Sequence, residues 1–292
     1  MQIQHSFKET TQGCLYLVPT PIGNLEDMTY RAVHTLQHSD LILAEDTRNS
    51  GKLLKHFDIH VPMQAFHEHT NENQLNAIVE MIVSGKTVSL ISDAGMPVIN
   101  DPGHPLVQTL LIQDIPVVAL PGANAAVTAL VASGLAADRF TYYGFFPRKA
   151  SAQEAVIETL GHRDETAIFY ESPHRIEQTL EKLTACLPGN TQVVIARELT
   201  KKFESFIRGS VEAVLESLKA QPIKGEIVLL IQGGTLAQHQ QDNLSEAMIV
   251  QAVQTYIDEQ GMKPNHAIKQ VAKDYDLKRN DVYECYHQLH SQ

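Results

Sequence analysis

Two carboxylates and an arginine stand together in Ala44–Arg48, directly after the short apolar run Leu41–Ala44. Glu45 and Asp46 could act as a general base or bind a cation, because carboxylates accept protons and attract cations. Arg48 beside them should lower their pKa values and would suit a phosphate group. A capped helix start with a surface ion pair explains the same residues. This segment alone therefore leaves both interpretations open.

A second segment, Val88–Pro105, combines an apolar run with a loop that is dense in glycine and proline. The run Val88–Ile91 is typical of a buried strand, and the loop after it carries the carboxylates Asp93 and Asp101. Asp101 followed by Pro102 predicts a helix N-terminus. Ligands bind where loops leave the carboxyl ends of strands in open α/β sheets, so we expect this loop to form the floor of a ligand site. The alternative is an ordinary connection stiffened by proline.

Similar loops follow other predicted strands. Pro19–Leu25 is stiff at one end and permissive at the other, which lets a ligand approach its backbone closely. Asn124 and Ser172 are good helix N-caps, the latter with Pro173 at the first helical position, and amides at helix starts bind carboxylates and phosphates. Helix capping or a plain turn accounts for each loop taken singly. Arg197–Lys202 adds dense charge, for which a solvated loop is the default interpretation.

The sequence lacks the standard motifs of several site classes. It contains no G-x-G-x-x-G loop and no complete G-x-x-x-x-G-K-[ST] motif, which disfavours dinucleotide and P-loop chemistry. His67 and His69 lack the i, i+4 spacing of a zinc protease motif, so we expect no metal site. The three cysteines are far apart and fit a reducing cytoplasm. No apolar run approaches the roughly 20 residues of a membrane span, so we expect no membrane association.

The elements that would position these loops alternate regularly in the first half of the chain. Short apolar runs separated by helix-like stretches are the signature of a parallel sheet with crossover helices. Strands are predicted at Leu15–Val18, Leu41–Ala44, Val88–Ile91 and Val117–Leu120, and helices at Met28–Leu36, Asn71–Val83, Leu106–Ile112 and Ala125–Ser133.

After Gly134 more of the predicted strands can pair as hairpins, so we expect a mixed sheet. We therefore predict two α/β domains, at residues 1–122 and 123–234. Strands are predicted at Thr141–Phe146, Thr166–Tyr170, Gln192–Ala196, Phe203–Ile207 and Glu226–Ile231. Helices are predicted at Ala152–Leu160, with Ser151 and Glu154 as a capping box, at Pro173–Leu187, and from a Ser210 cap to Leu218.

A polar linker at 235–243 precedes a small helical appendage at 244–292. Its predicted helices, Glu246–Glu259, Pro264–Lys273 and Arg279–Leu289, have the spacing of a helix-turn-helix. Generic three-helix packing explains this pattern as well as nucleic-acid docking does. The net charge of −11 argues against wholesale coating of nucleic acid, but local basic clusters weaken that argument.

Taken together, the loops match a known family. The chain resembles the tetrapyrrole-methylase superfamily, and more closely its branch of bacterial ribosomal small-subunit RNA cytidine 2′-O-methyltransferases. The resemblance covers roughly Leu15 to Gly234, and the three-helix appendage is similar to that of the same branch. S-D-A-G-M-P differs from the G-D-P-x-x form of the small-molecule branch, which favours the RNA branch. The ordered motifs are VPTPIGNL, AEDTR, SDAGMPVINDPG, LPGANA, FYESPHR, ARELTK and KGEIV.

The resemblance implies S-adenosylmethionine bound in the cleft between two α/β domains, and a homodimer, while the cysteine usage predicts a cytoplasmic location. It implies as substrate a cytidine ribose near the decoding centre of 16S ribosomal RNA, free or within the small subunit. Carried over residue by residue, the cofactor contacts are Pro21, Asp93, Gly95, Met96, Pro97, Asn124, Ala125, Glu171, Ser172, Lys224, Gly225 and Glu226.

A ribose hydroxyl is a poor nucleophile, so its proton must be removed. Candidate catalytic residues are Glu45, Asp46, Glu198 and Lys201, of which we favour the Glu45/Asp46 pair. Two other functions stay open: a tetrapyrrole or other small-molecule methyltransferase with a deep apolar cleft, and a ligand-sensing DNA-binding regulator without turnover. The side chains expected to hold RNA phosphates are Arg48, Arg197, Lys201, Lys269, Lys273, Lys278 and Arg279.

Overall fold

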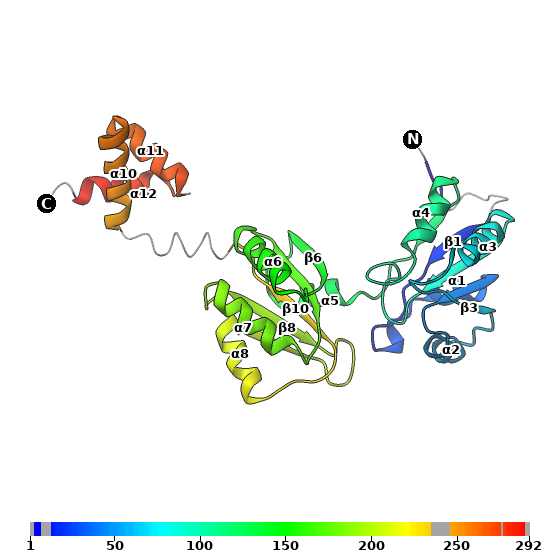
Figure 1. Cartoon of the computed structure of the whole chain (residues 1–292). Helices are drawn as coiled ribbons and strands as arrows, with labels where there is room; N and C mark the ends of the chain where they lie inside the picture. The colour runs from blue at the N-terminus through cyan, green and yellow to red at the C-terminus, as the bar shows by residue number, and fades with distance from the viewer. Residues whose placement is uncertain (1–2, 7–12, 235–245, 276, 290–292) are drawn as a thin grey trace.

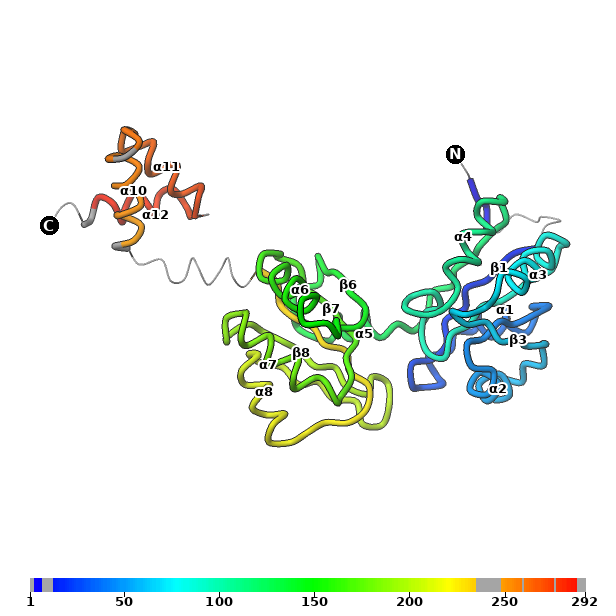
Figure 2. Tube along the Cα trace, viewed as in Figure 1, coloured from blue at the N-terminus to red at the C-terminus, as the bar shows by residue number. Residues whose placement is uncertain are grey.

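The computed structural model describes residues 3–6, 13–234, 246–275 and 277–289. They form two five-stranded sheets with flanking helices and a C-terminal group of three helices (Figure 1). The chain passes from the first sheet to the second once, through the segment before α5 (Ala125–Ser133) (Figure 2). The expectation of an α/β fold with a parallel sheet, a mixed sheet and a helical appendage is confirmed.

The first sheet is entirely parallel, with the strand order β3-β2-β4-β1-β5. Side chains alternate between its two faces, so one face packs Leu43 against Ile82, and the other packs Ile42 against Leu36. Its strands are β1 (Cys14–Leu17), β2 (Leu41–Ala44), β3 (Met63–Ala65), β4 (Thr87–Ile91) and β5 (Val117–Ala119), and its other elements are η1 (Leu25–Asp27), α1 (Tyr30–Gln37), α2 (Thr47–His56), α3 (Glu72–Val83) and α4 (His104–Ile112).

Besides the three-residue 3-10 helix η1, two elements of this half were not predicted from the apolar pattern. Strand β3 has only three residues, which are partly exposed, so it presents no apolar run. Helix α2 is mostly polar and buries only Ser50 and Leu54. Strand β3 forms by pairing with β2, and α2 follows directly after β2, so neither element depends on an apolar pattern of its own.

The second sheet is mixed, with the strand order β6-β7-β10-β8-β9, and only the β6–β7 pair is parallel. The last strand, β10, lies at the centre of this sheet and is fully buried. Three helices cover one face, while α5 covers the other. The remaining elements are β6 (Phe140–Phe145), β7 (Thr166–Glu171), β8 (Gln192–Arg197), β9 (Ser205–Ser210), β10 (Ile227–Ile231), α6 (Ala150–His162), α7 (Ile176–Cys186) and α8 (Val211–Ala220).

Two predicted helix caps are confirmed. Asn124 caps α5 by accepting a hydrogen bond from the amide of Val127 at 3.0 Å. Ser210 caps α8 by accepting from Ala213 at 3.3 Å. Both caps are local side-chain-to-backbone contacts, which sequence spacing is able to reveal.

Three other predicted helix starts are wrong. Helix α4 begins at His104 after Gly103, so Asp101 is not its N-cap. Helix α7 begins at Ile176, because residues 172–175 first form a turn in which Ser172 accepts from the amide of His174. Helix α6 begins at Ala150 after Lys149, and within the described part of the chain no side chain caps it, so the Ser151 capping box is absent.

The C-terminal helices are α10 (Glu246–Gln260), α11 (Pro264–Asp274) and α12 (Arg279–Leu289), close to their predicted bounds. They pack around a core of their own that includes Val253, Ile268, Val271 and Val282. The predicted linker at 235–243 lies outside the described residues. Among the helices that the structure describes, none is both long and apolar enough to span a membrane.

Candidate functional site

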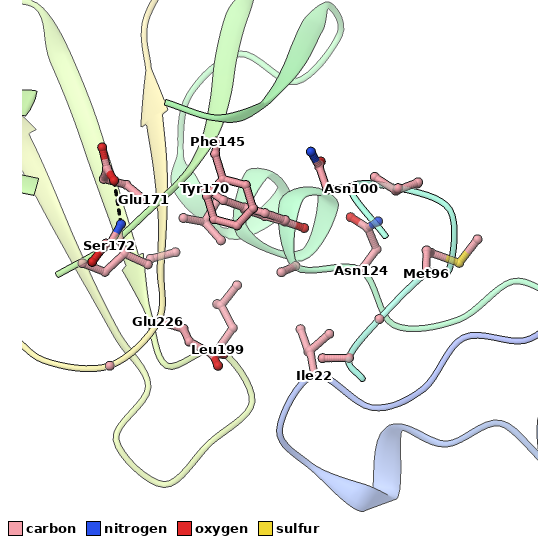
Figure 3. Close-up of a pocket in the computed structure, with 18 of the residues that line it drawn as sticks. Ile22, Met96, Asn100, Asn124, Phe145, Tyr170, Glu171, Ser172, Leu199 and Glu226 are labelled. Atoms are coloured by element: carbon pink, nitrogen blue, oxygen red, sulfur yellow. Dashed lines mark hydrogen bonds between the residues drawn. The ribbon is translucent and has the colours of Figure 1, made fainter. Parts of the chain in front are cut away.

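A cavity of about 400 Å³ lies between the loops of the first sheet and the second sheet. Its volume is within the range of about 300–1,000 Å³ that is usual for small-molecule sites. Residues from four motif loops reach it: Ile22, Met96, Asn124 and Glu226 (Figure 3). Loops far apart in the sequence therefore open onto one common space.

Most of the residues expected to touch the cofactor line this cavity. The structure brings together Gly95, Met96, Asn124, Ala125, Glu171, Ser172, Gly225 and Glu226. Pro21, Asp93, Pro97 and Lys224 lie next to lining residues in the sequence but outside the lining. The side chain of Asp93 accepts instead from the amide of Asp46 at 3.3 Å and from Asn49 Nδ2 at 3.4 Å, at the start of α2.

The apolar wall of the cavity was missed by reasoning from the sequence. Ile22 and Leu199 face each other across one end, and Tyr170 and Phe145 lie at the opposite side (Figure 3). Ile22 and Leu199 are buried together in the core that joins α5 to the second sheet. Their apolar character predicts burial but not a ligand, so only the contact between the two loops identifies them.

Helix α5 points its N-terminus at the cavity through Asn124 and Ala125. The helix dipole and the first amides make this end attractive to a carboxylate. The hydroxyl of Tyr170 interacts with the amide of Ala126 in the same turn. The structure thus places a positive helix end beside an aromatic ring.

Asp101 is a cavity-lining residue whose position the helix-cap interpretation did not predict. It lines the cavity, and burial is the main cause that raises the pKa of its carboxyl to about 6. The carboxylates of Glu45 and Asp93 raise this pKa further, whereas a hydrogen bond with Ser92 lowers it. A carboxylate held in such surroundings is strongly stabilised by a cationic ligand. Its position in a loop dense in glycine and proline was the available signal.

The Glu45/Asp46 pair lies beside this cavity but outside its lining, and its two members differ. Asp46 caps α2, accepting from the amide of Arg48 at 2.8 Å and from its side chain at 2.9 and 3.2 Å. These bonds with Arg48 lower the pKa of Asp46 to about 2. Burial, then Asp93 and Glu68, raise the pKa of Glu45. Glu45 is therefore the better proton acceptor near pH 7, and Arg48 is already paired.

Glu198 and Lys201, the other candidate catalytic residues, form a clamp beside the cavity. Lys201 Nζ lies 3.0 Å from Glu198 Oε1 and 3.0 Å from Glu226 Oε2. Glu198 also accepts from the amide of Glu226 at 2.9 Å, and this bond is the main cause that lowers its pKa. A Cβ on Gly225, whose φ is +100°, would lie 2.5 Å from Glu198. The clamp holds the backbone of residues 225–226 at the cavity wall.

Other predicted residues also make contacts within the protein. Arg197 donates through Nε to the carbonyl of Lys224. The buried carboxylate of Glu171 accepts from the amide of Ser172 at 2.7 Å and from Thr179 at 2.8 Å. Glu171 therefore shapes the wall, because its oxygens already have donors.

The predicted basic residues of the appendage are exposed. Lys269 and Lys273 lie one turn apart on α11, and Lys278 and Arg279 lie at the start of α12. Among the described residues, no cluster of three or more His, Cys, Asp and Glu side chains could hold a metal ion.

The chain is similar in sequence to known proteins. The profile of a family described as tetrapyrrole (corrin/porphyrin) methylases matches residues 14–215. The chain is 50% identical over 290 residues to ribosomal RNA small subunit methyltransferase I of Streptococcus pyogenes serotype M1, covering 99% of this chain and 100% of the relative. The protein of that name from Bacillus subtilis (strain 168) is 42% identical over 287 residues, covering 97% and 98%.

Solved structures share the fold. Uroporphyrin-III-C-methyltransferase from Thermus thermophilus superimposes with a TM-score of 0.54 at 20% identity, covering 78% of this chain and 97% of that one. Diphthine synthase superimposes with a TM-score of 0.59 at 14% identity, covering 76% and 90%. The family profile spans the first sheet and the second as far as α8, and so includes the cavity-lining loops around Ile22, Gly95 and Asn124. The chain therefore belongs to the tetrapyrrole (corrin/porphyrin) methylase family.

Proposed function

We propose that this chain transfers a methyl group from S-adenosylmethionine to ribosomal RNA of the small subunit. The observation that carries the proposal is the full-length match, at 50% identity, to the S. pyogenes protein named for that activity. In finer detail, we propose that the acceptor is the 2′-hydroxyl of a cytidine ribose near the decoding centre of 16S ribosomal RNA. We place the enzyme in the cytoplasm, where this substrate is found.

The cavity fits the methyl donor in size and in chemistry. The donor supplies a methyl group that is activated by attachment to a positively charged sulfur. Asp101 would stabilise its positive charges, and the N-terminus of α5 at Asn124 would hold its carboxylate. The apolar side chains of Ile22 and Leu199 would cover its adenine ring and exclude water.

We propose Glu45 as the group that accepts the proton of the ribose hydroxyl. Its raised pKa gives it more affinity for a proton than an ordinary carboxylate has, and its charge acts on Asp101 in the cavity wall. Asp46 would position the start of α2, and the Glu198–Lys201 clamp would position Glu226. Orientation of the hydroxyl against the methyl group could contribute several of the ~7–11 kcal/mol that positioning can supply.

We propose that RNA phosphates contact the exposed cations around the cavity and on the appendage. Arg48 is highly exposed, with 87% of its side chain accessible, although it is paired with Asp46. Arg197 and Lys201 would contribute while keeping their contacts to the second sheet. Lys269, Lys273, Lys278 and Arg279 would add an electrostatic contribution from the appendage.

We propose that two copies of the chain form a homodimer. Val127 and Val131 on α5 and Phe140 and Phe145 on β6 are exposed apolar side chains on two elements that contribute to the same core of the second half. Val131 is 74% exposed and Phe145 is 61% exposed, and Phe145 also lines the cavity. A second copy covering this surface would remove apolar area from water beside the cavity.

The decisive experiment incubates the purified protein with methyl-labelled S-adenosylmethionine and with under-methylated small ribosomal subunits. We expect label in the small-subunit RNA, on a nucleotide whose 3′ phosphodiester bond resists alkaline cleavage because its 2′-oxygen is methylated. Label transferred only to a porphyrinoid would favour a small-molecule methyltransferase. Binding to a specific DNA duplex without turnover would favour a ligand-sensing regulator. Either outcome would overturn the proposed function.

A further inference from the structure

The loop between β4 and α4 has an unusual backbone. Val98 has a φ of +76° and Asn100 a φ of +64°. A left-handed conformation is rare for a β-branched residue such as valine, and it persists only where the surroundings enforce it. Residues 99–101 of this loop form part of the cavity wall. Contacts with residues outside the loop must therefore stabilise its backbone conformation.

Strand β6, from the second half of the chain, makes the contact that could do so. The hydroxyl of Tyr142 donates to Asn100 Oδ1 at 2.6 Å. Asn100 also lies against Gly144, where a Cβ would lie 2.9 Å from Asn100 Nδ2. Because Gly144 has no side chain and adopts a φ of +74°, the Asn100 side chain can pack directly against its backbone.

Tyr142 also contacts Tyr170, another residue of the cavity wall. Its ring contacts that of Tyr170 edge-on, with centroids 5.1 Å apart. The two hydroxyls interact, and that of Tyr170 interacts in turn with the amide of Ala126 in α5. This series of contacts links the strained loop, β6, β7 and the start of α5. It therefore connects the segment that carries Asp101 with the helix end proposed to hold the donor's carboxylate.

We propose that Tyr142 is a positioning residue whose hydrogen bond to Asn100 holds Asp101 toward the positive charge of the methyl donor. The inference rests on the proposed function, because it concerns the same cavity. Tyr142 itself need not touch the donor. It acts by fixing the loop, so its loss should change both the strength of donor binding and the way in which binding depends on pH.

The dependence on pH follows from the surroundings of Asp101. The groups that act on it are the carboxylates of Glu45 and Asp93, the Ser92 hydroxyl, and the tyrosines Tyr142 and Tyr170. Burial is the largest cause of its raised pKa. A loop released from β6 would expose the carboxyl to water, so its pKa would fall toward the ordinary value for aspartate. Donor binding would then survive to lower pH.

The test is Tyr142→Phe in the full chain, with Tyr143→Phe as the matched control. Tyr143 is the next residue of β6 and stacks on Phe169, with ring centroids 4.9 Å apart. Its buried hydroxyl makes no hydrogen bond to any residue that the structure describes. Asn100→Ala, which removes the acceptor, is the second variant. Calorimetric titration with S-adenosylmethionine between pH 5 and pH 8 gives the affinity of each protein.

We expect Tyr142→Phe to weaken binding about three- to tenfold at pH 8, the effect of one lost hydrogen bond. We also expect the pH at which affinity declines to move downward. Asn100→Ala should change donor affinity and its pH dependence as much as Tyr142→Phe does. The variant that carries both replacements should bind the donor little more weakly than either single variant. Tyr143→Phe should bind the donor as the parent protein does. Parent-like affinity and pH dependence in Tyr142→Phe would overturn the inference. A parent protein that does not bind the donor would instead overturn the proposed function.

Discussion

The replacement Asp101→Asn tests the assignment of the cavity most directly. It keeps the size of the side chain and removes the one charge that we assign to stabilising the cationic donor. Two unit charges about 4 Å apart interact by about 4 kcal/mol at an effective dielectric constant of about 20. Asp101 is only partly buried, so we reduce this to about 2 kcal/mol for screening by water. The corresponding loss of affinity is about 30-fold.

The pH dependence provides a second, independent readout. The carboxyl of Asp101 must be ionised to pair with a cation, and its pKa in the folded protein is about 6. Affinity of the parent protein should therefore be constant above this pKa and should decline as the pH falls through it. The Asp101→Asn variant has no such proton, so its weaker affinity should not show this decline. Calorimetric titration across pH 5 to 8 measures both effects.

The same replacement should stabilise the protein when no donor is bound. Burial raises the pKa of Asp101 in the folded state above its unfolded value. The folded state then binds more protons between the two pKa values, so stability falls as the pH rises through that window. The loss of folding stability caused by the buried, ionised carboxylate is fully present above about pH 6. Asp101→Asn removes it, so the variant should unfold at a higher temperature at pH 8.

Asp93→Asn is the matched control, because Asp93 lies in the same loop but outside the cavity lining. We expect it to bind the donor about as tightly as the parent protein at pH 8. Parent-like affinity in Asp101→Asn, or a pH dependence unchanged by that replacement, would refute the electrostatic role of Asp101. A large loss in Asp93→Asn would show that the sequence-based assignment of Asp93 was better than the one drawn from the cavity.

Three further predictions concern the proposed base, the dimer and the appendage. Glu45→Gln should lower kcat by about 10²–10⁴-fold while leaving donor affinity nearly unchanged, because it removes a proton acceptor; a parent-like kcat in methyl-transfer assays would exclude Glu45 as the base. Val131→Asp should convert the dimer to a monomer in light scattering, because it places a charge in the apolar surface; an unchanged mass would exclude that surface. Lys269→Glu combined with Lys273→Glu should weaken binding to small-subunit RNA and reduce its salt dependence; an unchanged salt dependence would show that α11 makes no phosphate contact.

The overall organisation of the chain could be predicted from its sequence for a simple reason. A buried parallel strand such as Leu41–Ala44 needs a continuous apolar run, and helix caps such as Asn124 and Ser210 act within a few residues of themselves. Local patterns record these requirements directly. The family resemblance rests on ordered motifs, and it is confirmed by the profile match over residues 14–215. Strand β3, whose three residues are partly exposed, has no such pattern and was not predicted.

The site was only partly predictable, because its chemistry depends on contacts between distant segments. The motif at 92–103 showed that Asp93 and Asp101 lie in a special loop, but not which of them faces the cavity. Glu45 and Asp46 are neighbours in sequence, yet burial raises the pKa of one and Arg48 lowers that of the other. Sequence spacing contains neither burial nor the partner of a charge.

The amino-acid sequence by itself determined the two kinds of sheet, the helical appendage and the loops that carry the motifs. Each of these follows from apolar periodicity or from turn residues within a short window. Only the tertiary structure decided that Ile22 and Leu199 lie in one core, that Tyr142 holds Asn100 and that Asp101 lines the cavity. These contacts join segments about 40 to 180 residues apart in the chain. Close packing fixes such pairings through shape and excluded water, which no local pattern of residues can specify.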